Sequence, residues 1–182
     1  MLIPVNETIS LQVLEPFHAE SLLNVVQENR AYLKEWLPWV DSMQTVEHFS
    51  NYINLCQKQA VDKTDFGFAI IIEKNMAGRI GMHHINQQNK IGEIGYWLAA
   101  RWQGRGIITQ CCRAIMNYGF TELGLNRIEI KCGTGNHKSK AIAEKLGFKN
   151  EGILRQAELL NGQFIDLNLY AMLKTEWEKN NC

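Results

Sequence analysis

The stretch RWQGRGIITQ, from Arg101 to Gln110, contains the residue types that bind phosphate groups. Gly104 and Gly106 would let the backbone approach an anion without a Cβ in the way, while Arg101 and Arg105 would add positive charge nearby. The residues that follow have the pattern of a helix, and the free N–H groups and dipole of a helix N-terminus attract anions. The stretch therefore predicts a phosphate site, but an ordinary strand–helix turn with solvated arginines accounts for the same residues equally well.

Two well-known phosphate-binding motifs are missing from the chain. No GxxxxGK[ST] occurs, which excludes a P-loop, and no GxGxxG follows a predicted strand, which argues against a Rossmann unit. Two glycines before a helix are a weak signal by themselves. Their ligand must therefore be inferred from other parts of the sequence.

Residues with metal-binding or redox chemistry have unfavourable spacing. The cysteines are Cys56, Cys111, Cys112, Cys132 and Cys182. Their number is odd and no CxxC occurs, so neither a disulfide framework nor a zinc site is expected. Cys111 and Cys112 fall in a predicted helix and are expected to pack in the core. His83 and His84 fall in a predicted strand, where neighbours point to opposite faces, so we expect no metal site there.

The elements that must position the glycine stretch follow from the periodicity of apolar residues. Alternation and β-rich composition predict strands at Ile9–Val13, Phe66–Glu73, Met76–Ile85, Ile91–Leu98, Arg127–Cys132, Phe148–Leu160 and Gln163–Leu173. A helical period predicts helices over His18–Asn29, from an N-cap at Thr45 through Cys56, from the glycine stretch to about Leu123, and over Ser139–Leu146, closed by Gly147.

Three connections complete the predicted order of elements. Asn161-Gly162 is a strong signal for a tight hairpin, and Lys74-Asn75 is expected to join a second hairpin. The aromatic stretch Tyr32–Val40, interrupted by Pro38, is expected to be an irregular loop. The resulting order predicts one α/β domain that spans residues 1–182 and contains a mixed sheet.

The bulk composition predicts a cytoplasmic protein. Hydrophobic residues make up 46% of 182, enough for a sizeable core, and 19 basic residues balance 19 acidic ones. A chain without net charge or a basic block is not expected to bind nucleic acid directly. The N-terminus MLIPVNETIS lacks the features of a signal peptide, and the apolar run FAIII is too short to span a bilayer. The cysteine pattern suits a reducing compartment.

Three blocks of the sequence together resemble a known family. EIGYWL followed by QGRGI, then NRIEIKC, then NHKSKAIAEKLGF occur in the order and at the spacing of the GNAT superfamily of acyl-CoA-dependent N-acetyltransferases, and the resemblance covers nearly the whole chain. It implies the GNAT acyl-CoA N-acyltransferase fold of the α/β (α+β) class, with a mixed, mostly antiparallel twisted sheet flanked by helices. It also implies acetyl-CoA as the co-substrate.

The resemblance assigns the glycine stretch to the pyrophosphate of CoA, because the superfamily loop has the form Q/R-x-x-G-x-G/A. The residues implied to bind the co-substrate are Leu98, Gln103, Gly104, Arg105, Gly106, Ile107, Ile108, Thr109, Asn136 and Ser139. Ile108 stands where the family has a small residue, so its side chain is expected to point into the core. Asn136 resembles the asparagine that bonds the pantetheine arm, although asparagine is also a common turn residue.

The C-terminal third is similar to one branch of the superfamily. IKCGTGNHKS together with EGILRQAELLNGQFIDLNLYAML resembles the ribosomal-protein N-acetyltransferases, which acetylate the N-terminal serine of the ribosomal stalk protein. The implied acceptor is the α-amine of a protein or peptide, in particular a ribosomal protein. Two alternatives stay open: an enzyme for a small amine such as an antibiotic or polyamine, and a non-catalytic acyl-CoA-binding domain. Assembly into a homodimer or a higher homo-oligomer is also open.

The resemblance implies three catalytic groups. The backbone N–H of Leu98 would stabilise the oxyanion, Glu158 in QAELLNG would be the general base, and Ser139 in NHKS the general acid. Ser139 inherits that role because Ala143 occupies the place where many GNAT enzymes carry a tyrosine. Taken without the resemblance, Ser139 could instead bond the backbone of a helix N-terminus, and Glu158 could be a solvated strand residue.

Cysteine and tryptophan side chains near these groups have two interpretations each. Cys132 would place a thiol near the CoA sulfur, or would serve as a small buried hydrophobe. Trp36, Trp39, Trp97 and Trp102 would line the acceptor cleft or fill the core. The first two lie in a predicted loop, which favours the cleft for them.

Overall fold

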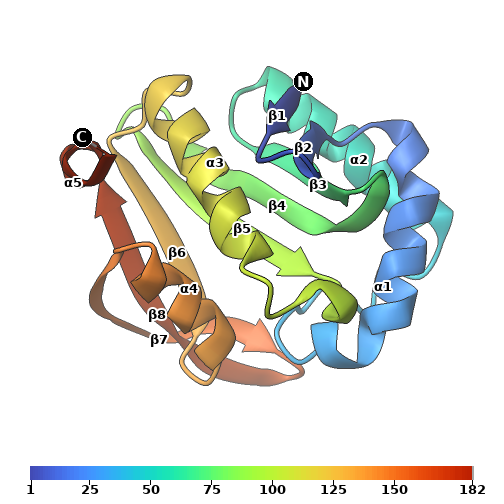
Figure 1. Cartoon of the computed structure of the whole chain (residues 1–182). Coiled ribbons are helices and arrows are strands. Elements are labelled where there is room, and N and C mark those ends of the chain that lie inside the picture. Colours follow the sequence, from blue (N-terminus) through green and yellow to red (C-terminus); the bar gives the residue numbers. More distant parts are fainter. Residues whose placement is uncertain (182) are drawn as a thin grey trace.

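A computed structural model describes residues 1–181, whose strands form one sheet in the order β1-β2-β3-β4-β5-β6-β8-β7 (Figure 1). The strands are β1 (Leu2–Pro4), β2 (Ile9–Val13), β3 (Phe66–Ile72), β4 (Asn75–Asn86), β5 (Ile91–Leu98), β6 (Arg127–Gly133), β7 (Lys149–Leu160) and β8 (Gln163–Leu173). The α-helices are α1 (Ala19–Leu33), α2 (Val46–Val61), α3 (Ile107–Thr121), α4 (His137–Lys145) and α5 (Lys174–Asn181). Short 3₁₀ turns precede α1 and α3, at Pro16–His18 and Ala100–Trp102.

The sheet is mixed and mostly antiparallel, as predicted. Among the described strands, β5 and β6 form the one parallel pair, and the crossover between them contains α3. The other neighbouring strands run antiparallel. A parallel pair requires such a long crossover, so the glycine stretch lies where β5 ends and the crossover begins.

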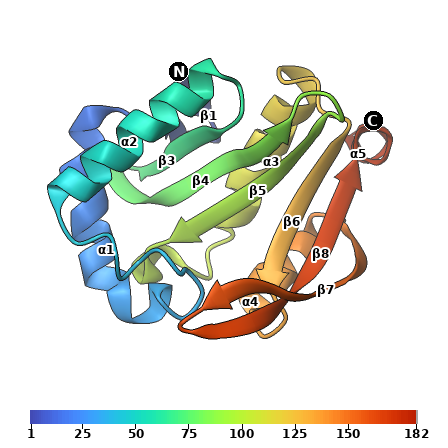
Figure 2. The same cartoon turned by 180° about the vertical axis from the view of Figure 1, so that it is seen from behind.

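Helices cover both faces of the sheet, and alternate strand residues pack on each side. Figure 1 shows α3 and α4 on one face, whereas Figure 2 shows α1 and α2 on the other, over β3 and β4. Ile80, Ile94 and Ile128 belong to the core under α3. Ala69 and Trp97 belong to the core under α1 and α2. Residues of one strand whose numbers are both even or both odd therefore point to the same face of the sheet.

Several local predictions are confirmed. The Thr45 hydroxyl accepts a hydrogen bond from the backbone N–H of His48 at 3.2 Å and so caps α2. Gly147 follows α4 with φ of 81°, the left-handed conformation that a helix C-terminus favours. Asn161 and Gly162 both have positive φ, 50° and 80°, as a tight type I′ hairpin turn requires.

Other boundaries differ from the predictions. Helix α1 continues to Leu33 instead of ending at Asn29, because Leu33 extends the buried face of the helix by one turn and Pro38 stops the chain only later. The first two residues of the predicted loop, Tyr32 and Leu33, therefore belong to α1. The turn between β3 and β4 lies at Glu73-Lys74, one residue earlier than predicted, since these two residues adopt the positive φ values of 48° and 72°.

Two short terminal elements escaped prediction. Strand β1 is only three residues long and pairs with β2 at the edge of the sheet. Helix α5 lacks an apolar stripe, and its Trp177 packs against the core under α3 with its ring 5.1 Å from that of Phe120. Cys182 lies outside the described residues. None of the helices described is long and apolar enough to cross a membrane.

Candidate active site

An opening between β5 and β6 is the central feature of the site. The two strands pair only from Ile91 to Glu93 and from Arg127 to Glu129. Beyond these residues β5 stays paired with β4 as far as Leu98, and β6 stays paired with β8 as far as Gly133. The strands diverge accordingly (Figure 2). The inner edges of the opening therefore carry backbone groups that no neighbouring strand can bond.

Leu98 directs its backbone groups into this opening. The N–H of Ala99 bonds the carbonyl of Ala77 on β4 at 2.7 Å, and successive residues of a strand direct their N–H groups to opposite sides. The N–H of Leu98 therefore points away from β4. Its carbonyl, on the same side, accepts hydrogen bonds from the Tyr32 hydroxyl and from Gln103 Nε2. A free N–H at this point can bind an oxygen that develops negative charge.

The glycine stretch forms the N-terminus of α3. Gly104 and Gly106 have φ of 75° and 71°, and apart from their chain neighbours no atom of the described residues lies within 4 Å of the position a Cβ would take on either. The first helical hydrogen bond runs from the N–H of Gln110 to the carbonyl of Gly106. Within the described part of the chain no side chain caps this end of the helix, and its first turn contains no acidic residue. The arrangement suits an anion above the loop.

The residues around that loop supply N–H groups and positive charge. The side chains of Ile107, Ile108 and Thr109 are buried, so these residues offer only their backbone N–H groups to a ligand. The inward position predicted for Ile108 is confirmed. Arg101 and Arg105 stack on the ring of Trp102 with guanidinium–centroid distances of 5.6 and 5.1 Å, and the ammonium of Lys138 donates to Gln103 Oε1 at 2.9 Å.

The start of α4 lies on the α3 side of the opening. The Asn136 carboxamide caps α4 by accepting from the N–H of Ser139 at 3.1 Å. The Ser139 hydroxyl is therefore not the cap of its helix, and its Oγ lies 2.8 Å from the phenolic oxygen of Tyr96 on β5. Sequence reasoning missed Tyr96, although it shares a strand face with Leu98 two residues away.

Cys132 lies beside the Ser139 hydroxyl. Its side chain is buried, and that burial raises the pKa of the Cys132 thiol, while hydrogen bonding to Ser139 and Asn168 opposes the rise. It belongs to the core under α3, together with the packing shell that includes Tyr96. The thiol is therefore both a buried core group and a neighbour of Ser139, so the two interpretations of Cys132 are compatible.

Glu158 lies on the other side of the sheet, in the long β7–β8 hairpin. The register of β7 slips between Leu154 and Glu158, and Gln156 in the slip has φ of 49°. The N–H of Gln156 donates to Asp166 at 2.8 Å and fixes this bulge, and such a bulge re-aims the residues that follow it. Glu158 is half-buried and does not behave as a fully solvated strand residue.

Glu93 on β5 is close enough to Glu158 for its charge to act on it, and Glu93 belongs to a cluster of charged residues on β5 and β6. Burial raises the pKa of the Glu158 carboxyl, and the negative charge of Glu93 raises that pKa further. The Lys131 ammonium bonds Glu93 at 2.8 Å and Glu129 at 3.4 Å. The odd-numbered residues of β5 share a face with Trp97, which belongs to the core under α1 and α2. Glu93 therefore lies on the α1–α2 face, and so do Glu129 and Lys131, because Lys131 bonds both carboxylates. The candidate acid and base therefore occupy opposite faces of the opening.

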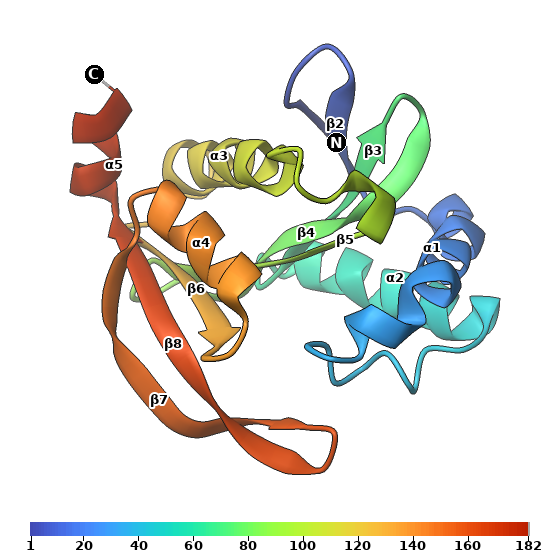
Figure 3. The same ribbon diagram turned by 60° about the horizontal axis from the view of Figure 1, so that its bottom comes forward.

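The loop after α1 closes one side of this space. Figure 3 shows the β7–β8 hairpin reaching toward that loop, and the Asn161 carboxamide donates to the carbonyl of Lys34 at 3.0 Å. Trp36 lies against Gly133 and Gly135. Trp97 is buried in the core, with the ring of Trp39 6.3 Å away. Among the four tryptophans, Trp36 therefore borders the opening and Trp97 fills the core.

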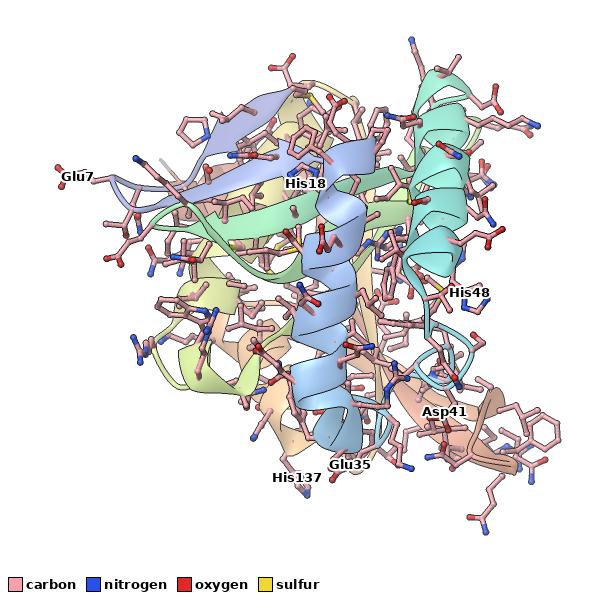
Figure 4. The ribbon with its side chains drawn as sticks, turned by 90° about the vertical axis from the view of Figure 1, so that its right-hand side faces the viewer. Glu7, His18, Glu35, Asp41, His48 and His137 are labelled. Atoms are coloured by element: carbon pink, nitrogen blue, oxygen red, sulfur yellow. The ribbon has the colours of Figure 1, made fainter. Side chains whose placement is uncertain are left out.

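Other conspicuous features lie apart from the opening. An open pocket of about 580 Å³ is lined by Glu7, His18 and their neighbours. Figure 4 shows His18 at the end of α1 opposite Glu35, and Glu7 on the connection between β1 and β2. His83 bonds Asp65 at 2.7 Å, whereas the exposed His84 bonds Glu93 at 3.4 Å, so the two neighbouring rings have different carboxylate partners. Within residues 1–181 no three His, Cys, Asp or Glu side chains are placed to hold a metal ion.

Comparison with known proteins gives one consistent family. Residues 9–149 match the family described as acetyltransferase (GNAT) domain. YdaF of Bacillus subtilis (strain 168) is 37% identical over 175 residues, covering 96% of each chain. The ribosomal-protein-serine acetyltransferase of Escherichia coli (strain K12) is 33% identical over 174 residues, covering 94% of this chain and 96% of that protein.

Solved structures agree with this result. A ribosomal L7/L12 alpha-N-protein acetyltransferase in complex with coenzyme A, in which the CoA forms a disulfide with a cysteine, superposes with a TM-score of 0.92. It is 31% identical, and the match covers 95% of this chain and 98% of that one.

Proposed function

The chain belongs to the GNAT acetyltransferase family and is an acetyl-CoA-dependent N-acetyltransferase, and from this premise we propose that its acceptor is the N-terminal α-amine of a ribosomal protein. Full-length similarity to proteins named for ribosomal acceptors supports this acceptor. We further propose that residues 1–182 act as one catalytic domain in the cytoplasm.

The proposed acetyl-CoA site follows the crossover. The pyrophosphate would lie on the N–H groups between Gln103 and Thr109, above the two glycines, with Arg105 adding charge. Asn136 uses its carbonyl oxygen as the α4 cap, which leaves its amide N–H groups for the pantetheine arm. The thioester would then lie in the opening, next to the free N–H of Leu98.

The proposed chemistry begins on the α1–α2 face. An α-amine has a pKa of about 7.7–8.0, so a useful fraction is neutral and a weak, well-placed base suffices. The amine nitrogen attacks the thioester carbon while Glu158 takes its proton, directly or through one water. The oxygen becomes an oxyanion, which the N–H of Leu98 stabilises. The C–S bond then breaks, Ser139 protonates the CoA sulfur and recovers a proton from water, and Glu158 releases the proton of the amine to water.

The opposite placement of Glu158 and Ser139 is the observation that supports this mechanism most. A base must meet the incoming amine, whereas an acid must meet the leaving sulfur, and nitrogen and sulfur are two different substituents of the tetrahedral carbon that the attack creates. An enzyme that carries the two groups on opposite faces of one opening satisfies both requirements without moving either side chain.

Acetyl transfer to a panel of amines tests the acceptor. A peptide with a free N-terminal serine or alanine should react faster than spermidine or an aminoglycoside, and mass spectrometry should locate the acetyl group on the α-amine. The same peptide with a blocked N-terminus and a free lysine is the matched control and should not react. Preferential turnover of spermidine would show that the acceptor is a small polyamine and not a protein.

Cys132 has a proposed secondary chemistry that depends on the same placement. The related structure with a CoA–cysteine disulfide supports the proposal that the Cys132 thiol lies within reach of the CoA sulfur. Exchange with CoA disulfide would join Cys132 to one CoA and release the other as a thiol.

A further inference from the structure

Tyr96 is the unassigned group closest to the proposed chemistry. Its phenolic oxygen lies 2.8 Å from Ser139 Oγ and 3.4 Å from the backbone carbonyl of Ser139. The two residues are 43 positions apart and come from β5 and α4. The contact therefore depends on how α4 docks over the end of the opening.

Either of the two hydroxyl oxygens can donate in the 2.8 Å contact. Burial raises the pKa of the Tyr96 phenol, so the phenol keeps its proton throughout the physiological range. Both of its neighbours on Ser139, the hydroxyl and the carbonyl, can accept that proton. When Tyr96 donates to Ser139 Oγ, the proton of the Ser139 hydroxyl is left free to point elsewhere.

We propose that Tyr96 is a positioning residue, whose phenol donates to Ser139 Oγ and thereby directs the Ser139 proton toward the sulfur that leaves from the opening. The proposal rests on the acid role of Ser139 in the proposed function. Tyr96 itself neither gains nor loses a proton in this scheme. The C–S electron pair goes to the sulfur, and Ser139 supplies the proton that the sulfur takes.

The same helix provides a matched control for this contact. Tyr170 on β8 is fully buried, and its phenol donates to Glu144 of α4 at 3.3 Å. Like Tyr96, it joins a strand to α4 through a phenol, but it contacts no group proposed to act in the reaction. Tyr170→Phe therefore removes a phenol–α4 contact without touching Ser139.

A double-mutant cycle tests the proposal. Acetyl transfer is measured for the parent, Tyr96→Phe, Ser139→Ala and the double variant, with whichever amine the enzyme acetylates best. Loss of one hydrogen bond to the acid should lower kcat of Tyr96→Phe by about 3- to 10-fold, with KM for acetyl-CoA unchanged. Tyr170→Phe should keep parental kcat. In the Ser139→Ala background, Tyr96→Phe should cause no further loss, because Tyr96 acts only through Ser139.

The outcomes separate this proposal from the one on which it rests. If Ser139→Ala keeps the kcat of the parent, Ser139 is not the acid and the proposed mechanism is refuted. If Ser139→Ala is slow but the effect of Tyr96→Phe is additive or absent, the mechanism stands and the positioning role fails. An equal loss in Tyr170→Phe would indicate general loosening of α4. Circular dichroism and the rise in Tm with acetyl-CoA verify that each variant is folded.

Discussion

Trp36 of the loop after α1 lies directly against Gly133, the last residue of β6. A Cβ on Gly133 would meet Trp36 Cζ3 at 2.9 Å, closer than real Cβ contacts come, whereas Gly135 would place its Cβ at 3.3 Å from the same ring. Gly133 does not have positive φ. The absence of a side chain at Gly133 is therefore required by the indole and not by the backbone.

This relationship predicts the effect of Gly133→Ala. We expect it to lower the free energy of unfolding by about 1–3 kcal/mol, the usual cost of overpacking, and to raise the acceptor KM by displacing Trp36. In a Trp36→Ala background the same change should cost little stability, because the conflicting ring is gone. Denaturant unfolding of the four variants provides the measurement. Equal costs in both backgrounds would mean that the ring does not restrict Gly133.

Gly106→Val should weaken acetyl-CoA binding. Its φ of 71° is costly for a residue with a Cβ, about 1–2 kcal/mol, and a branched side chain would cover the N–H groups at the mouth of α3. Gly124 also has positive φ, 62°, and open space around it, so Gly124→Val is a control with the same backbone strain. Calorimetric titration should show weaker binding in Gly106→Val alone. Equal binding in both variants would show that the pyrophosphate does not bind at this loop.

Glu158→Gln should retain the shape of the site and lose the base. Removal of a general base lowers the rate on the order of 10²–10⁴-fold, and part of the loss should return at high pH, where more of the amine is neutral. Acetyl-CoA binding should survive, because Glu158 lies on the acceptor face. Glu151→Gln, on the same strand but paired with Arg127, is the control. Turnover of Glu158→Gln near the parental rate at neutral pH would exclude Glu158 from the reaction.

Glu93→Gln should shift the pH profile of the enzyme. The negative charge of Glu93 raises the pKa of Glu158, so its removal makes Glu158 easier to ionise and lowers that pKa. A base acts only when ionised, so the acid limb of kcat/KM should move to lower pH. Glu129→Gln, which also removes a partner of Lys131, should leave the limb in place. A shift to higher pH, or the same shift in both variants, would contradict the proximity of Glu93 to Glu158.

Cys132 should exchange with CoA disulfide. Intact-mass spectrometry should detect one covalently bound CoA per chain that dithiothreitol removes, and Cys132→Ser should abolish it. Since burial raises the pKa of the thiol, the adduct should form faster as pH rises and more thiolate is present. Cys111 and Cys112 are fully buried and should stay unmodified. An adduct that persists in Cys132→Ser would place another cysteine next to the sulfur of CoA.

The sequence alone determined the features that depend on neighbouring residues. The glycine loop before α3, the cap at Thr45 and the turn at Asn161-Gly162 each follow from the conformations that one or two residue types allow. Alternation likewise predicted most strands, whereas the inward position of Ile108 was implied by the family resemblance. Strand β1 and helix α5 were not predicted, because their few residues carry no periodic pattern.

Only the tertiary structure decided which of these residues meet. The opening at Leu98 depends on where the pairing of β5 with β6 stops, which is after Glu93 and Glu129. The contact of Tyr96 with Ser139, the proximity of Glu93 to Glu158 and the packing of Trp36 on Gly133 each join segments far apart in the chain. Such contacts depend on strand register and on the docking of helices, which no local pattern of residues encodes.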